Sequence, residues 1–168
     1  MHRWFRLLII AAISGLVVLI DQLTKNWFEK TGNSSVFLFL DGFVRSIHFE
    51  NHGAIANLAI PSLLIIAISL VICGLIVFGL YRSAKRGRWP FLLSLSILLG
   101  GAIANLSDRI RLGYVRDWIL LFNRSAINVA DIAIAAGGLW FLWIVSKRQN
   151  KDVHKSEIIA EQTFGQGL

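Results

Sequence analysis

The sequence predicts an all-α polytopic membrane protein with four transmembrane helices and a small extracytoplasmic β-sheet or loop segment between the first two helices. The chain has 168 residues, of which 55% are hydrophobic, and its mean hydropathy is +0.63. A soluble domain of this length would not contain several long apolar runs, whereas a membrane helix needs about 20 predominantly apolar residues. Four such runs are present, at residues 7–23, 63–81, 91–106 and 132–146.

Each of the four runs is expected to form a helix, because a bilayer admits only helices or closed barrels and none of the runs alternates as a strand would. The first run is interrupted only near its end, by Asp21, and the second and third contain no charged residue. The third and fourth runs are short for a membrane crossing. Their polar flanks, residues 105–109 and 128–131, are therefore expected to enter the membrane as well. We expect the first helix to remain uncleaved, since charged residues follow it directly.

The distribution of charge predicts the orientation. The N-terminal stub, the connection at residues 82–88 and the tail from Lys147 together contain ten basic and three acidic residues. Lys and Arg favour the cytoplasmic side, so both termini are predicted to be cytoplasmic. Residues 1–148 are expected to form the membrane domain, and residues 149–168 a polar cytoplasmic tail that is disordered or a loose helix. The net charge of +7 indicates this topology and attraction to anionic membrane lipids, not nucleic-acid binding.

The segment between the first two helices has strand character. Residues 36–40 and 44–49 are rich in β-branched and aromatic residues and are joined through Asp41-Gly42. They predict a small sheet on the outer face of the membrane. His48 and His52 are four residues apart, but in a strand-like stretch this spacing does not support zinc binding. The single cysteine, Cys73, excludes an internal disulfide and a cysteine metal cluster, and we expect neither metal nor cofactor.

Several polar residues near the predicted outer ends of the helices are expected to lie at the same depth in the membrane. Asp21 and Lys25 are spaced i,i+4 and share a helix face on which they can pair. The third helix presents Asn105, Asp108 and Arg109 on one face, and Asn128 and Asp131 share a face of the fourth; Gly100-Gly101-Ala102 allows close helix approach. Some of these groups are also explained as structural ion pairs that hold the bundle together, and that alternative stays open.

Two aspartates stand out as a candidate catalytic pair. Asp117 and Asp131 are 14 residues apart, at the two ends of the last hairpin. A carboxylate near a bilayer is expensive, so it usually marks function. Two neighbouring carboxyls share one proton, which allows one to take a proton from water while the other donates to a carbonyl oxygen. This chemistry requires neither a metal nor a covalent intermediate.

Five short motifs occur in order between residues 7 and 148. They are DQLTK at residues 21–25, NHGA at 51–54, GGAIANLSDR at 100–109, VRDW at 115–118 and NVAD at 128–131. In these motifs the chain resembles the lipoprotein signal peptidase (signal peptidase II) family.

The resemblance implies an aspartic endopeptidase of the bacterial cytoplasmic (inner) membrane that removes signal peptides from prolipoproteins at a diacylglyceryl-modified cysteine. It implies that Asp117 and Asp131 are catalytic, with the site near the outer leaflet. Lipid-modified prolipoproteins and membrane lipids would be the partners, and no oligomer is implied. The residues implied to line the site are Asn51, Asn105, Asp108, Arg109 and Asn128, with Asp21 and Lys25 as structural polar residues.

The chain departs from the family pattern at a few positions. Ala104 stands where Gly is usual, Ala56 where an aromatic is usual, and Ile127 where Phe is usual. Arg116 replaces a usual apolar residue. These changes concern substrate preference more than reaction type. Together with Arg111 and Arg124, Arg116 is expected to meet lipid headgroups.

Two other classes of function fit parts of the sequence. A small four-helix transporter would use Asp21, Asp108 and Asp131 as a proton relay. It predicts polar residues at the middle of the bilayer, whereas the polar cluster lies at one interface. A non-catalytic membrane scaffold would use the charges only to hold helices together, and neutral Asn at both Asp117 and Asp131 would then preserve function.

Overall fold

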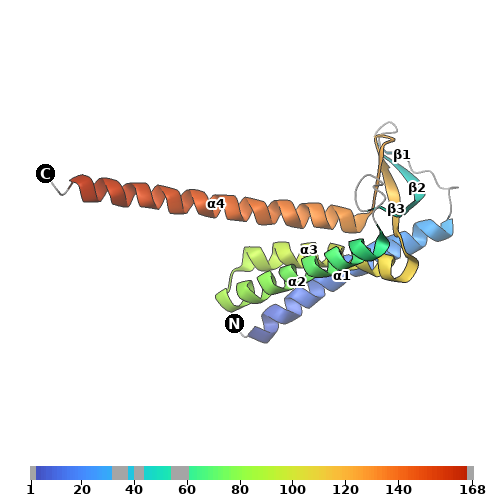
Figure 1. Cartoon of the computed structure of the whole chain (residues 1–168), viewed down its shortest axis with the longest axis horizontal. Helices are drawn as coiled ribbons and strands as arrows, with labels where there is room; N and C mark the ends of the chain where they lie inside the picture. Colours follow the sequence, from blue (N-terminus) through green and yellow to red (C-terminus); the bar gives the residue numbers. More distant parts are fainter. Residues whose placement is uncertain (1–2, 32–37, 40–43, 54–60, 166–168) are drawn as a thin grey trace.

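Four long helices and a small sheet make up the part of the chain that the structure, a computed structural model, describes: residues 3–31, 38–39, 44–53 and 61–165. The helices are α1 (Arg3–Thr31), α2 (Ser62–Arg86), α3 (Trp89–Leu112) and α4 (Val129–Gly165), and the strands are β1 (Leu38–Phe39), β2 (Val44–Asn51), β3 (Val115–Leu121) and β4 (Ser125–Ile127). The sheet lies at one end of the helices, where α1 and α3 end and α4 begins (Figure 1). The other end holds the N-terminus and the connection between α2 and α3.

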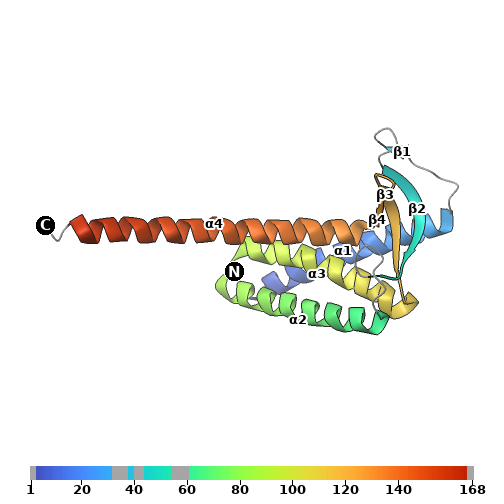
Figure 2. The same ribbon diagram turned by 45° about the horizontal axis from the view of Figure 1, so that its top comes forward.

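All four helices are long and apolar enough to cross a membrane, which confirms the predicted four-helix membrane fold. The candidate spans are Trp4–Thr31, Ser62–Arg86, Trp89–Leu112 and Val129–Lys151. They are longer than the apolar runs. Of the polar flanks at residues 105–109 and 128–131, all residues lie inside helices except Asn128, which directly precedes α4. The fourth span continues as helix to Gly165 and projects beyond the other helices (Figure 2). The segment from residue 149, which was expected to be disordered or a loose helix, is therefore helical up to Gly165. The division of the chain into a membrane domain and a tail stays a prediction.

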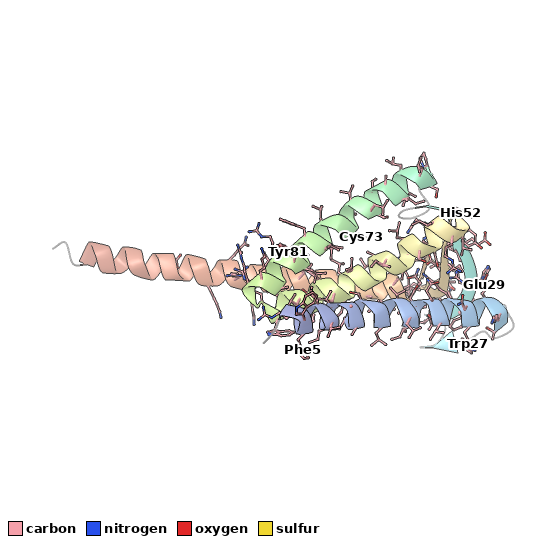
Figure 3. All side chains as sticks on the ribbon, turned by 90° about the horizontal axis from the view of Figure 1, so that it is seen from below. Phe5, Trp27, Glu29, His52, Cys73 and Tyr81 are labelled. Carbon is pink, nitrogen blue, oxygen red and sulfur yellow. The ribbon has the colours of Figure 1, made fainter. Side chains whose placement is uncertain are left out.

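Helix α3 is the centre of the bundle. In its most apolar window 56% of the residues are buried inside the protein, compared with 11–17% for the other three spans. The others present large apolar side chains outward, including Leu19, Leu75 and Leu142. Figure 3 shows side chains that project outward along the helices. In a soluble protein such a surface would be an aggregation hazard, but in lipid it is the expected exterior.

Two adjacent glycines let α3 approach both of its neighbours. A Cβ on Gly100 would lie 2.8 Å from the backbone oxygen of Ser14 in α1, and one on Gly101 would lie 2.5 Å from that of Ala130 in α4. Both distances are too short for a side chain, so the small-residue patch permits backbone contact on two sides. This close packing holds α1, α3 and α4 together, so that their ends meet beside the sheet.

The sheet is larger than the sequence predicted. Its order is β1-β2-β3-β4, with all neighbours antiparallel. The expected strands between α1 and α2 are present as β1 and β2. Residues 36, 37 and 40 of the first expected strand and the connection at 41–43 lie outside the described residues. The connection between α3 and α4 adds β3 and β4, which form a hairpin closed at Phe122 and Asn123, both at positive φ. Strand β3 pairs with β2 in a register that places Asp117 opposite Phe49.

Candidate active site

The N-terminus of α4 fixes Asp131. Asn128 precedes the first residue of the helix, and its Oδ1 accepts a hydrogen bond from the backbone N–H of Asp131 at 2.9 Å. The Oδ2 of Asp131 accepts the backbone N–H of Asn128 at 3.1 Å in return. This reciprocal arrangement is a capping box built from Asn and Asp. It satisfies backbone donors that the first turn cannot satisfy itself, and it orients the Asp131 carboxylate.

Asp117 is held from two sides. The Nδ2 of Asn51 donates to its Oδ2 at 2.9 Å, and the Nδ2 of Asn128 donates to its Oδ1 at 2.6 Å. Asn51 is itself oriented, because its Oδ1 accepts the backbone N–H of Gly53 at 3.1 Å. The Asp117 carboxyl is 1% exposed, although it lies on a strand at the end of the bundle. Strand β3 therefore carries its carboxylate into the protein.

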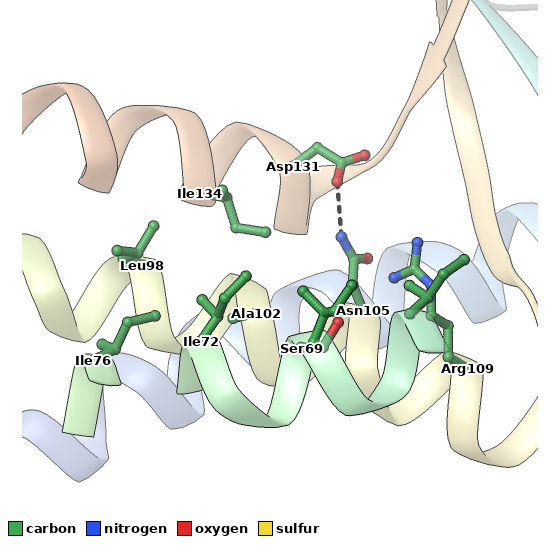
Figure 4. A pocket seen from close by; sticks show the side chains of 11 residues that line it. Ser69, Ile72, Ile76, Leu98, Ala102, Asn105, Arg109, Asp131 and Ile134 are labelled. Atoms are coloured by element: carbon green, nitrogen blue, oxygen red, sulfur yellow. Dashed lines mark hydrogen bonds between the residues drawn. The ribbon is translucent and has the colours of Figure 1, made fainter. Parts of the chain in front are cut away.

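Asn105 of α3 completes the surroundings of the two aspartates. Its Nδ2 donates to Asp131 Oδ1 at 2.7 Å, a contact that is visible in Figure 4. Its Oδ1 accepts from Lys25 Nζ and from Asn128 Nδ2, both at 3.1 Å. Asn128 thus contacts Asp117, Asp131 and Asn105 at once, and the two carboxyls from β3 and α4 share one set of amide donors.

Burial raises the pKa of Asp117 to about 6. The hydrogen bond from Asn51 acts in the opposite direction and lowers this pKa, because it favours the ionised form. The neighbouring charge of Asp131 raises it again. A carboxyl with this pKa beside a second carboxyl is the setting in which a pair holds one proton near neutral pH.

A buried ion cluster lies behind the aspartates. Lys25 Nζ lies 2.7 Å from Asp21 Oδ2 and 3.1 Å from Asp108 Oδ2, so the pair indicated by the spacing of Asp21 and Lys25 is formed and includes α3. Asp21 Oδ1 also accepts the backbone N–H of Ala130 at 2.8 Å, at the start of α4. One carboxylate therefore ties α1 to the N-terminus of α4, where negative charge is favourable.

Arg116 is not at the lipid headgroups, and this expectation was wrong. Its side chain is buried and donates to Asp108 Oδ1 at 3.0 Å and to Glu29 Oε2 at 2.8 Å. Sequence reasoning also missed two other partners on α1, Gln22 and Asn26. The available signal was their spacing with Glu29 at i, i+4 and i+7, which places all three on one helix face.

Arg109 and Asp108 are neighbours in the chain, but their side chains contact different parts of the protein. Arg109 is half-buried and donates from Nη2 to the backbone oxygen of Gly53 at 3.2 Å. Asp108 is fully buried against Lys25, Arg116 and Gln22. Of the two, only Arg109 lines the cavity between α2, α3 and α4.

A cavity of about 350 Å³ opens between α2, α3 and α4 beside Asp131 (Figure 4). Its polar end is formed by Asn105, Arg109 and Asp131. The rest is almost entirely aliphatic, so an apolar chain placed there would bring a polar group to the carboxyls. The aliphatic and small lining residues are Ile65, Ile68, Ser69, Ile72, Ile76, Leu98, Ala102 and Ile134.

The two predicted histidines are not part of this site. His48 and His52 lie 3.9 Å and 3.4 Å from the two oxygens of Glu50, on the sheet. Within the described ranges, no three His, Cys, Asp or Glu side chains gather as a metal ion would require.

Four membrane-spanning helices with two amide-bound carboxyls beside an apolar cavity define a membrane-embedded peptidase of the aspartic type. The family model of signal peptidase (SPase) II matches residues 13–147. The chain belongs to this family, whose members are aspartic-type endopeptidases.

Relatives of known name support the same assignment over most of the chain. The lipoprotein signal peptidase of Pseudomonas putida is 34% identical over 155 residues, which cover 84% of this chain and 90% of that protein. The lipoprotein signal peptidase of Moorella thermoacetica is 33% identical over 129 residues, or 76% of this chain and 86% of that protein. A solved bacterial membrane enzyme has the same fold, with a TM-score of 0.71 at 21% identity over 84% of this chain and 90% of that one.

Proposed function

We propose that this protein releases signal peptides from prolipoproteins, with Asp117 and Asp131 as the two catalytic carboxyls. The observation that carries the assignment of residues is the position of Asn128, which donates its side-chain amide to Asp117 and its backbone amide to Asp131. Two ionised carboxylates placed side by side repel each other, so a purely structural pair would need a cation between them. A pair that shares one proton needs only neutral donors such as Asn128.

The reaction follows from a pair that holds one proton. The ionised carboxyl takes a proton from water, and the oxygen of that water attacks the scissile carbonyl carbon. The protonated carboxyl donates its proton to the carbonyl oxygen, which gives a neutral tetrahedral diol. Collapse of the diol breaks the C–N bond, and the leaving amine takes a proton from the carboxyl that first accepted one. The hydroxyl proton of the diol returns to the other carboxyl, so the pair ends with one proton.

The cavity supports a lipid-modified substrate. Its aliphatic walls suit acyl chains or an apolar signal peptide, and each buried methylene contributes about 0.8 kcal/mol. We assign Asn105 and Arg109 to binding of substrate carbonyl groups, since both line the polar end of the cavity. We assign Asn51 and Asn128 to holding Asp117, since both donate to its carboxyl. We assign Asp108, Asp21 and Lys25 to the support of this site, since all three are buried in one ion cluster.

The sheet end of the molecule is assigned to the outer leaflet of the bacterial cytoplasmic membrane, with both termini in the cytoplasm. In support, the opposite end carries Arg82, Lys85, Arg86 and Arg88 around the connection between α2 and α3. Basic residues favour the cytoplasmic side. Membrane lipids would then contact the exposed apolar faces of α1, α2 and α4.

A transporter is supported less well. A proton relay through Asp21, Asp108 and Asp131 would need groups that exchange protons along the bilayer. Instead, Asp21 and Asp108 are both paired with Lys25, and Asp21 also binds the backbone of Ala130 at the start of α4. Both carboxylates are therefore engaged in holding α1 to α3.

The test is incubation of the purified protein with a diacylglyceryl-modified preprolipoprotein, followed by gel electrophoresis. We expect release of the signal peptide, and much slower release from the same precursor without lipid. No release from the lipidated precursor would contradict the proposed activity, and equal rates on both forms would contradict the proposed lipid dependence.

A further inference from the structure

Arg116 lies immediately before Asp117 on β3, and the alternation of a strand points the two side chains to opposite faces. The Arg116 side chain reaches the outer end of α1. Its Nη1 donates to Asn26 Oδ1 at 2.7 Å and to Glu29 Oε2 at 2.8 Å, and its Nη2 donates to Gln22 Oε1 at 2.9 Å. Glu29 lies on the last turns of α1 beside the sheet (Figure 3).

The same residue is bound to α3 by both its backbone and its side chain. The backbone N–H of Arg116 donates to Asp108 Oδ2 at 3.3 Å, and Nη2 donates to Asp108 Oδ1 at 3.0 Å. A carboxylate that receives both groups fixes the position and the rotation of the strand at this residue. The next residue along that strand is Asp117.

A second route leads from Arg116 to the other aspartate. Asp108 is paired with Lys25 at 3.1 Å, Lys25 donates to Asn105 Oδ1 at 3.1 Å, and Asn105 donates to Asp131 Oδ1 at 2.7 Å. Arg116 is thus joined to Asp117 by one peptide bond and to Asp131 by successive hydrogen bonds. It does not line the cavity.

Charge balance also depends on Arg116. Asp21, Asp108 and Lys25 are each at most 2% exposed and together carry one excess negative charge. Arg116, 7% exposed, supplies the missing positive charge. Buried charges persist only where they are paired. The buried members of the cluster are therefore neutral only with Arg116 in place, while its other carboxylate partner, Glu29, is 45% exposed.

We propose that Arg116 is a positioning residue for the peptidase reaction, which holds β3 against α1 and α3 so that Asp117 is presented to Asp131. This inference rests on the proposed roles of the two aspartates. Arg116 gives this chain a connection between α1 and β3 that an apolar side chain could not make.

The test compares Arg116→Met and Arg116→Lys with the control Arg124→Met in steady-state cleavage of a lipidated precursor. Arg124 is exposed at the β3–β4 turn. We expect Arg116→Met to lower kcat by about 10- to 100-fold with KM within about twofold, because small misplacements of reacting groups have effects of this size. Arg116→Lys keeps the positive charge but lacks the planar guanidinium group with its several donors. Its kcat should therefore lie between those of the parent and the Met variant. The control should match the parent.

A variant at the other side of the contact avoids loss of folding. Asn26 and Glu29 are exposed, so Asn26→Ala combined with Glu29→Gln removes partners of Nη1 without disturbing the core. We expect kcat to fall several-fold at unchanged KM. Parental kcat in both this double variant and Arg116→Lys, or a rise in KM with unchanged kcat in either, would overturn the positioning role. Failure of the proposed function is distinct, since the parent itself would then not cleave or Asp117→Asn would cleave at the parental rate.

Discussion

Asn128 donates its side-chain amide to Asp117 at 2.6 Å, across the junction between the sheet and the fourth helix. The same residue caps α4 and thereby holds Asp131 through its backbone N–H. One uncharged residue therefore contacts both carboxyls, Asp117 through its side-chain amide and Asp131 through its backbone N–H. A neutral amide can do this without neutralising either, which leaves the pair free to share a proton.

The two aspartates are the first prediction. Asp117→Asn and Asp131→Asn should each abolish cleavage in the gel assay, because Asn can neither take a proton from water nor return one. The double variant should be about as inactive as either single variant, since groups that act as a unit are not additive. Melting curves should show all three variants folded. Cleavage near the parental rate by either single variant would favour the scaffold alternative.

A second prediction concerns Asn128. Asn128→Ala should lower kcat by at least about tenfold, because the Asp117 carboxyl loses an amide donor and the backbone N–H of Asp131 loses the acceptor that orients the start of α4. It should also reduce the free energy of unfolding by about 1 kcal/mol through loss of the helix cap. Ser125→Ala, at an exposed position of β4, is the matched control for both measurements. An unchanged kcat in Asn128→Ala would show that the carboxyls are positioned by other contacts.

The pH dependence of cleavage is the third prediction. The pKa of Asp117 is about 6. Above this pH the pair loses its shared proton, so kcat/KM should fall on the alkaline side of its pH profile. The apparent pKa of this alkaline limb is a property of the two coupled carboxyls together. Asn51 donates to ionised Asp117 and lowers its pKa. Asn51→Ala should therefore move the alkaline limb upward, by about one pH unit for a charge-assisted hydrogen bond. A downward shift would contradict this assignment.

The same pKa has a consequence for stability. A carboxyl whose pKa is higher in the folded protein than its usual value of 3.8 favours folding while it is protonated. This contribution is complete below about pH 4 and is lost as the pH rises through about 6. Relative to Asp117→Asn, the parent should thus become less stable between these pH values, by at most about 3 kcal/mol. Unfolding in detergent at pH 4 and pH 7 measures the difference, and a constant offset between the two proteins would contradict the raised pKa.

Local patterns predicted the helices and the two aspartates but not how they are supported. The apolar runs and the i,i+4 spacing of Asp21 and Lys25 are local signals, and the structure contains both features. Strand β3 was missed because Arg116 and Asp117 interrupt its apolar character, and its strand pairing is with distant β2. The partners of Arg116 on α1 are 87 to 94 residues away in the chain. The polar face of α1 is a local signal, but nothing local connects that face with Arg116.

A fourth prediction concerns the buried ion cluster. Lys25→Met removes the counter-charge of Asp21 and Asp108, which are both almost fully buried. Breaking a buried ion pair from one side leaves uncompensated charge and costs about 3–5 kcal/mol. We expect a large loss of thermal stability in detergent, and a smaller loss for Asp21→Asn, which keeps a polar partner for Lys25. Lys30→Met, at an exposed position in the last turn of α1, is the control. Equal melting temperatures for Lys25→Met and Lys30→Met would show that the cluster does not stabilise the bundle.

The fifth prediction is the orientation in the membrane. Arg124 lies at the sheet end of the molecule and Arg86 at the end of α2, and both side chains are exposed. In a Cys73→Ala background, Arg124→Cys should react with a membrane-impermeant thiol reagent in intact cells whose outer envelope is permeable to it. Arg86→Cys should react only after the cytoplasmic membrane is opened, because basic connections stay on the cytoplasmic side. Reaction of both positions after opening verifies that each thiol is accessible. Equal labelling in intact cells, or labelling of Arg86→Cys alone, would contradict a site at the outer leaflet.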